Sequence, residues 1–262
     1  MSSAPAARNV LRILRHLGER AAPARASTIA RDLDLPRSTV YHLLRELIEQ
    51  GFVVHYPEYR TYGPSSLLGE LSSAPRRAEQ LTRLGTPLLE RSVRLSSLPV
   101  VAHLSTLSGP DVIYLARVQT TRAPTTVTSV GVRLPAHLTA TGRSMLARLS
   151  PSQVRALYPD RLSLILRNEA GPRTLADLTH LLAATRARGF AMENGEVVRD
   201  FASVGAAAVD ASGYPAAAIG LTFRGPATED AWNTLGAIVI DAAHELSTRL
   251  TGRPHTSLPF PS

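Results

Sequence analysis

The chain has 262 residues, of which 44% are hydrophobic and 19% are charged, so its length and apolar content suit one large or two modest folded domains. It contains no cysteine, which excludes disulfide bonds, cysteine nucleophiles and thiolate metal sites. Because no apolar run reaches the length of a signal peptide or a membrane helix, the sequence predicts a cytoplasmic protein without a membrane partner.

The formal net charge is +8, and every basic residue counted in it is an arginine. Positive charge favours polyanionic partners, and arginine suits contacts to phosphate and guanine, but coding bias explains the absence of lysine equally well. Over residues 1–80 the excess is modest, with 11 arginines against 8 acidic residues. Charge alone therefore does not identify a DNA-binding protein.

Three short helices are predicted in the first 51 residues. An apolar stripe marks a helix over Ala7–Leu17. Ser27 is a suitable N-cap for the second helix, and Asp34 begins the turn that follows it. Pro36 suits the first position of the third helix, which Gly51 ends. Two amphipathic helices joined by so tight a turn are typical of a helix-turn-helix.

The next segment predicts a β-hairpin, which makes this unit a winged helix. Phe52–Tyr56 is expected to form one strand, Pro57–Arg60 the tip and Thr61–Gly63 the start of the returning strand. Leu67, Leu68 and Leu71 then recur at helical spacing, which predicts the start of a linker helix that Pro75 interrupts. The predicted DNA-binding domain therefore covers residues 1–75.

A recognition helix needs an apolar back and hydrogen-bonding side chains on its front. Arg37 and Arg45 can bond guanine O6 and N7 or phosphate, and the wing tip can reach the backbone or the minor groove. The predicted DNA-binding residues are Ser27, Thr28, Arg37, Ser38, Thr39, Tyr41, His42, Arg45, Tyr59 and Arg60. The alternative is a protein-interaction module whose polar face is merely solvated.

The second half predicts interleaved strands and helices, which indicates a mixed α/β sensor-like domain over residues 76–251, with residues 252–262 as a disordered tail. Helices are expected over 81–96, within 137–149, over 175–188 and over 228–250. Strands are expected over 100–106, 112–118, 203–209 and 216–223, with a further strand near 125–130.

Two separate regions resemble one protein family. Thr28–Leu44 is similar to the helix-turn-helix of the IclR-type bacterial transcriptional regulators. Gly131–Arg143 resembles the Pro-Leu-His-x-Thr-Ala-x-Gly-Lys loop and helix start of that family. Gly189–Ala191, Glu193–Glu196 and Ser203–Val209 resemble its acidic segment and the strand after it. The resemblance runs from about residue 8 to residue 250, in the expected order.

The resemblance implies an α+β fold: an N-terminal winged helix-turn-helix, a linker helix and a C-terminal effector-binding domain related to GAF and PAS sensors. It also implies a homodimer or tetramer on double-stranded DNA with a pseudo-palindromic operator, and a small effector that is an organic acid. Repression is the favoured sign, although activators share this architecture. Carried over from the family, the effector-binding residues are Ala140, Thr141, Gly142, Glu193, Phe201, Ser203, Gly220 and Thr222.

These residue types suit a carboxylate. The start of a helix at Ala140–Gly142 would present free backbone N–H groups and the positive end of a helix dipole. Ser203 and Thr222 would add hydroxyl groups, and Phe201 an apolar wall. Asp200, which stands where the family usually has glycine, and Gly220, where a polar contact is common, depart from the family pattern, so the effector's identity does not transfer.

Two other functions stay open at this point. An enzyme carrying a DNA-binding appendage would need a nucleophile with a base, or a metal cluster, in residues 80–250, and the scattered histidines show no metal-ligand spacing. We therefore predict no enzymatic activity, no catalytic residues, no metal and no cofactor. A C-terminal domain used only for oligomerisation would instead have an apolar, filled interior around Ala140–Gly142 and Ser203.

Overall fold

The computed structural model describes residues 4–20, 22–65, 68, 74–126 and 128–252. The chain divides into two compact units, Met1–Arg77 and Ala78–Ser262. Among the described residues, no helix is both long and apolar enough to cross a lipid bilayer. The expected linker positions Leu67 and Leu71 and the expected tail from residue 253 lie outside the described residues.

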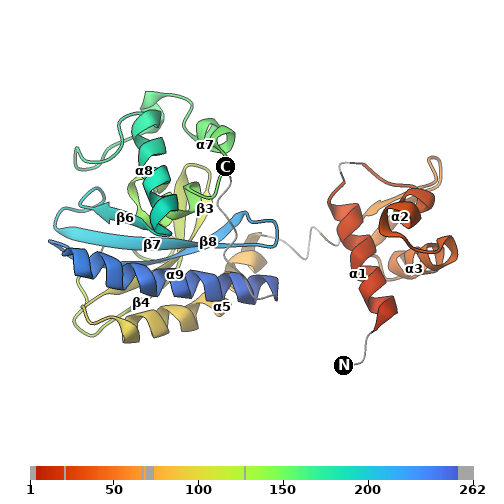
Figure 1. Ribbon diagram of the computed structural model, residues 1–262, viewed down its shortest axis with the longest axis horizontal. Helices are drawn as coiled ribbons and strands as arrows, with labels where there is room; N and C mark the ends of the chain where they lie inside the picture. Colours follow the sequence, from red (N-terminus) through yellow and green to blue (C-terminus); the bar gives the residue numbers. More distant parts are fainter. Residues whose placement is uncertain (1–3, 21, 66–67, 69–73, 127, 253–262) are drawn as a thin grey trace. The chain divides into compact units, whose positions relative to one another are not determined.

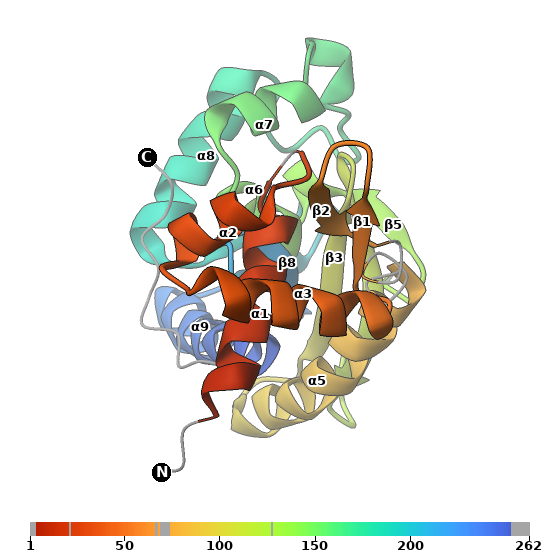
Figure 2. The same ribbon diagram turned by 90° about the vertical axis from the view of Figure 1, so that its right-hand side faces the viewer.

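The N-terminal unit is a helix-turn-helix followed by a hairpin, as predicted (Figure 2). Ile13, Ile29 and Leu44 are buried side by side in its core. Asp34 has a φ of 50°, the left-handed conformation that turns the chain between the second and third helices. The elements are α1 (Pro5–Gly18), α2 (Ala26–Leu33), α3 (Arg37–Glu49), β1 (Val53–Tyr56) and β2 (Thr61–Pro64).

Two expected helix starts in this unit were wrong by one or two residues. Ser27 lies inside α2, whose N-cap is Arg25, because Ala26 is buried in the core and draws the helix start back. Pro36 is the N-cap of α3 and not its first residue. Neither shift changes which side chains α3 exposes.

The linker region differs from the prediction. Helix α5 (Ala74–Leu95) begins seven residues before the expected start at Leu81 and contains Pro75 in its first turn. Proline costs little there, because first-turn N–H groups have no acceptor within the helix. Pro75 therefore lies within α5, while most of the expected linker helix before it falls outside the described residues.

The C-terminal unit is built on a six-stranded antiparallel sheet with the order β5-β4-β3-β8-β7-β6. The strand expected near residues 125–130 was wrong: the described residues there form no strand, and Thr126 and Thr128 bond each other through their hydroxyl groups instead. The strands are β3 (Val101–Ser108), β4 (Asp111–Gln119), β5 (Arg133–Pro135), β6 (Ala191–Asn194), β7 (Phe201–Val209) and β8 (Pro215–Arg224).

Helices cover both faces of this sheet (Figure 1). Helices α5 and α9 (Glu229–Thr251) pack on one face around a core that includes Leu88, Ile219 and Leu246. The other face carries a second core and the elements η1 (Ala136–Leu138), α6 (Ala140–Leu146), α7 (Pro151–Leu157), η2 (Arg161–Ser163) and α8 (Leu175–Arg188). This mixed α+β architecture confirms the predicted fold class.

Two glycines let the first turn of α6 lie directly on the sheet. A Cβ atom on Gly205 would come within 2.7 Å of the backbone of Ala140 and Thr141. A Cβ atom on Gly220 would come within 2.6 Å of the Thr141 side chain. Because β7 and β8 approach the helix so closely, the start of α6 is held over strand positions that line the candidate functional site.

Candidate functional site

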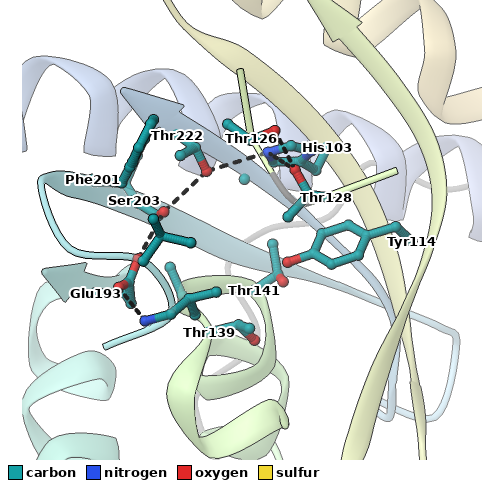
Figure 3. Close-up of a pocket in the computed structure, with 15 residues that line it drawn as sticks. His103, Tyr114, Thr126, Thr128, Thr139, Thr141, Glu193, Phe201, Ser203 and Thr222 are labelled. Carbon is teal, nitrogen blue, oxygen red and sulfur yellow. Dashed lines mark hydrogen bonds between the residues drawn. The ribbon is translucent and has the colours of Figure 1, made fainter. Parts of the chain in front are cut away.

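A pocket opens where the first turn of α6 and the loop after β6 meet the sheet (Figure 3). Seven of the eight predicted effector-binding residues line it, and Gly142 does not. Its lining residues are His103, Tyr114, Thr126, Thr128, Thr139, Ala140, Thr141, Glu193, Val197, Val198, Phe201, Ser203, Val204, Gly220 and Thr222.

The wall supplied by β3, β4 and the loop after β4 was missed by the sequence analysis. His103 enters the pocket because β3 pairs with β8 and sets His103 opposite Gly220. Tyr114 comes from β4, beyond the irregularity at Leu104 and Ser105. The sequence offered one usable signal, the alternation of a polar histidine and serine in an otherwise apolar strand, but it did not show which strand lies beside it.

Gly142 has a packing role. Its N–H group donates to the Thr139 side-chain oxygen at 3.0 Å, so it is not available to a ligand. A Cβ atom there would lie 2.2 Å from the Ala136 carbonyl oxygen. The N–H groups of Ala140 and Thr141, which begin α6, have no acceptor within the helix. The expected anion-binding turn is therefore reduced to two N–H groups on a helix of seven residues.

A chain of hydrogen-bonded polar side chains crosses the sheet face of the pocket (Figure 3). The Ser203 hydroxyl donates to Glu193 Oε2 at 2.9 Å and lies 3.0 Å from the Thr222 hydroxyl. Thr222 in turn lies 3.2 Å from His103 Nε2, and the Thr128 hydroxyl reaches the same nitrogen at 3.3 Å. The sheet therefore presents hydroxyl groups in hydrogen-bond contact with one carboxyl and one imidazole.

The imidazole of His103, which ends this series of hydrogen bonds, is uncharged at neutral pH. Burial lowers the pKa of His103 to about 3, and the nearby Arg117 adds to the effect. Burial also raises the pKa of Tyr114 above its usual range, so its hydroxyl keeps its proton. That hydroxyl points towards Thr141 and lies close enough for Thr141 to oppose the rise in the Tyr114 pKa, although the buried Thr141 Oγ1 makes no hydrogen bond of ordinary geometry (Figure 3). A ligand atom that bonded Thr141 would satisfy it.

Glu193 is the acidic group of the pocket, and its side chain is only 3% exposed. Its Oε1 accepts a hydrogen bond from the Val197 N–H group at 3.1 Å. The pKa of Glu193 is raised to about 7, because burial and the charge of Glu196 outweigh the hydrogen bonds from Val197 and Ser203 and the charge of Arg143. Near neutral pH, this carboxyl is therefore divided between its protonated and ionised forms.

Glu193 makes the stability of the protein dependent on pH. Its pKa rises from 4.5 in the unfolded chain to about 7 in the fold. The contribution of Glu193 to folding stability is therefore fully present below pH 4.5, where the carboxyl is protonated in both states. It is lost as the pH rises through 7, because the buried carboxyl must then ionise. Glu193→Gln removes the effect. In thermal unfolding followed from pH 4 to pH 8, we expect the variant to gain about 1–3 kcal/mol relative to the wild type across that window. A difference that stays constant with pH would contradict the shift.

The exposed face of the N-terminal unit gathers the predicted DNA-binding residues. Ser27, Tyr41, Tyr59 and Arg60 line one groove between the start of α2 and the wing tip, together with Arg25, which the sequence analysis missed. A second groove along α3 is lined by Tyr41, His42 and Arg45 with Leu44, Ile48 and Tyr62. Arg37 and Ser38 are also exposed, whereas Thr28 and Thr39 are half-buried.

Comparison with known proteins decides the family. Residues 6–57 match the family model "IclR helix-turn-helix domain", and residues 79–248 match "Bacterial transcriptional regulator IclR C-terminal". The chain belongs to the IclR family of bacterial transcriptional regulators. The acetate operon repressor of Salmonella typhimurium is 28% identical over 248 residues, which are 92% of this chain and 88% of that protein.

Two further IclR-family proteins are similar over most of their length. The Pca regulon regulatory protein of Pseudomonas putida is 30% identical over 216 residues, or 81% of this chain and 72% of that protein. A crystal structure of an IclR homologue from Microbacterium hydrocarbonoxydans, complexed with 4-hydroxybenzoate, superposes with a TM-score of 0.56 at 23% identity, covering 94% of this chain and 98% of that one. The latter likeness shows the shared fold.

The fold explains one departure from the IclR pattern. Asp200 has a φ of 66°, in the left-handed region that glycine adopts most readily. Aspartate tolerates this region better than most residues. The Asp200 carbonyl oxygen accepts a hydrogen bond from the Gly225 N–H group at 2.8 Å, which fixes this turn beside the end of β8. Asp200 thus keeps the backbone geometry just before Phe201, which lines the pocket.

Proposed function

We propose that this IclR-family regulator is a repressor whose affinity for DNA is set by a small organic acid bound in the pocket of its C-terminal unit. The observation that carries this proposal is the pocket itself. A domain used only for oligomerisation would have a filled apolar interior at the start of α6, whereas here Thr141, Ser203 and Thr222 surround open space. The name of the Salmonella relative, a repressor, supports repression over activation of transcription.

The donors around the pocket favour a carboxylate-containing effector. Ala140 and Thr141 line the pocket, and their N–H groups have no acceptor within α6, while the Thr141 hydroxyl adds a further polar group. Phe201 and Val198, with Val197 and Val204, supply an apolar wall for the rest of the molecule. The Microbacterium homologue, crystallised with 4-hydroxybenzoate, binds a compound of this class.

The electrostatics of the pocket disfavour an enzyme. The Ser203 hydroxyl donates to Glu193, and Thr222 separates it from His103, so the pocket holds one hydroxyl–carboxyl pair and no serine–histidine pair. With a pKa of about 3, His103 is a poor general base at neutral pH. Among the described residues there is also no group of three metal-ligating side chains. We therefore propose binding without catalysis.

The remaining parts of the proposal concern the assembly. The exposed residues of α2, α3 and the wing would bind double-stranded DNA, with two copies of the unit on the half-sites of a pseudo-palindromic operator. This requires a homodimer or a tetramer of this chain, acting in the cytoplasm. Acid binding would change the populations of the forms that do and do not bind DNA.

The test is binding of the purified full chain to its own upstream intergenic DNA, measured by fluorescence anisotropy with and without benzoate, 4-hydroxybenzoate and succinate. We expect specific binding that at least one acid changes about tenfold, a coupling of about 1.4 kcal/mol. Thr141→Val keeps the shape and removes the unpartnered hydroxyl, so it should weaken the effective acid about 5-fold. Thr179→Val, on the exposed face of α8, is the control. DNA binding that no acid alters would refute the proposal that an acid bound in the C-terminal unit sets the affinity for DNA.

A further inference from the structure

Glu193 and any effector must occupy the same small cavity. The carboxyl of Glu193 lines the pocket and is almost fully buried. None of the described residues that line the pocket has a cationic side chain, and its one imidazole, His103, is neutral. An anionic effector would therefore meet an acidic group with no lining cation to offset it.

The cation whose charge acts on Glu193 is already engaged. Arg143 on α6 is buried, and its guanidinium donates to the carbonyl oxygens of His137 at 2.8 Å and Met192 at 2.9 Å. The same guanidinium pairs with Glu196 at 3.0 Å. Turning Arg143 towards the pocket would leave Glu196 and two buried carbonyl groups without their partner, which is costly. Arg143 thus holds the loop after β6 and is not available to an effector.

The groups around Glu193 act on its protonation in opposite directions. Its own loop contributes the negative charge of Glu196, and α6 contributes Arg143, whose charge Glu196 offsets. From β4 the neutral hydroxyl of Tyr114 faces the same space, and from β3 the neutral His103 is linked to it through Thr222 and Ser203. Arg117 on β4 is close enough to lower the pKa of His103 but does not line the pocket, so no lining group can neutralise a second carboxylate.

We infer that an anionic effector binds together with one proton, which Glu193 holds and shares with the carboxylate of the effector. This rests on the proposed function and specifies how its pocket accepts a carboxylate. The proton comes from solvent and adds to a Glu193 oxygen, while the other oxygen keeps its existing hydrogen bond. Two carboxylates in one cavity cannot both be ionised, whereas an acid beside a carboxylate forms a strong hydrogen bond.

The inference sets a measurable pH dependence. Because the free Glu193 has a pKa of about 7, the protonated form becomes scarce above that pH. If the bound form always carries the proton, effector affinity falls about tenfold between pH 6 and pH 8. The carboxyl groups of benzoate and 4-hydroxybenzoate stay ionised throughout this range, so for these two acids the change in affinity arises from the protein.

The experiment is isothermal titration calorimetry of the full chain with benzoate, 4-hydroxybenzoate and succinate at pH 6 and pH 8, in buffers that differ in ionisation enthalpy. We expect uptake of nearly one proton per bound acid at pH 8 and little at pH 6. Glu193→Gln, whose side chain is neutral at every pH, should bind the acid with the same affinity at pH 6 and pH 8. The control Glu229→Gln, an exposed acid in the first turn of α9, should behave like the wild type.

The outcomes separate this inference from the proposed function. Binding with equal affinity at both pH values and no proton uptake overturns the inference and leaves the effector pocket standing. A pH dependence that persists in Glu193→Gln overturns the assignment to this residue. If that variant does not bind, a ¹³C carboxyl titration of the wild type decides, since the acid must raise the Glu193 midpoint by more than one pH unit. No binding of any acid at pH 6 overturns both proposals.

Discussion

Replacing Arg37 and Arg45 together by alanine is expected to weaken specific DNA binding about 30-fold or more, while the N-terminal unit stays folded. Both side chains are exposed on α3, and neither contributes to the core formed by Ile13, Ile29 and Leu44. An arginine that reads guanine or phosphate contributes about 1–3 kcal/mol, so losing two costs about 2–6 kcal/mol. Fluorescence anisotropy with operator DNA at fixed salt measures the change.

A matched control separates recognition from net charge. Arg15→Ala with Arg155→Ala removes the same two charges from exposed positions on α1 and α7, outside α3 and the wing. That variant should lose only a few-fold in affinity, because distant surface charges are screened by salt. Equal losses in both double variants would mean that the effect is general electrostatic attraction, and the assignment of α3 as the recognition helix would fail.

The DNA-binding face and the effector pocket differ in how far the sequence predicts them. The helix-turn-helix is local: apolar spacing, Asp34 and Gly51 are enough to place α2 and α3 within a residue or two. Thr39 and Thr28 were expected on the exposed face but are half-buried, because residues on the flank of a helix lie between its core and solvent sides. Arg25 was missed since it lies in a loop with no periodic signal.

The pocket depends on contacts between distant segments. The resemblance supplied the α6, β6, β7 and β8 residues, whereas His103 and Tyr114 reach the pocket through strand pairings that no local pattern encodes. The raised pKa of Glu193 is likewise a property of burial beside Glu196, and the sequence shows only two acids three residues apart. The number of acidic residues can be counted from a sequence, but the burial that shifts their pKa values depends on the fold.

Gly142→Ala tests the correction to the predicted site and should lower the stability of the C-terminal unit substantially. The added methyl group would overlap the Ala136 carbonyl oxygen, at 2.2 Å, and the Ala136 Cα, at 2.4 Å. Backbone cannot turn aside as a side chain can, so η1 or α6 must move. Overpacking of this kind typically costs 1–3 kcal/mol, and we expect about 3 kcal/mol or more here, seen as a Tm lower by roughly 6–12 °C.

The control is Gly18→Ala, where the added methyl group meets nothing within 4 Å at the end of α1. It should leave the Tm of the C-terminal unit unchanged. The two roles of Gly142 then separate cleanly. A packing role predicts a loss of stability that the effective acid partly offsets, because ligand binding stabilises whatever fold survives. A ligand-contacting role predicts normal stability with no acid binding, and that result would restore Gly142 to the effector-binding set.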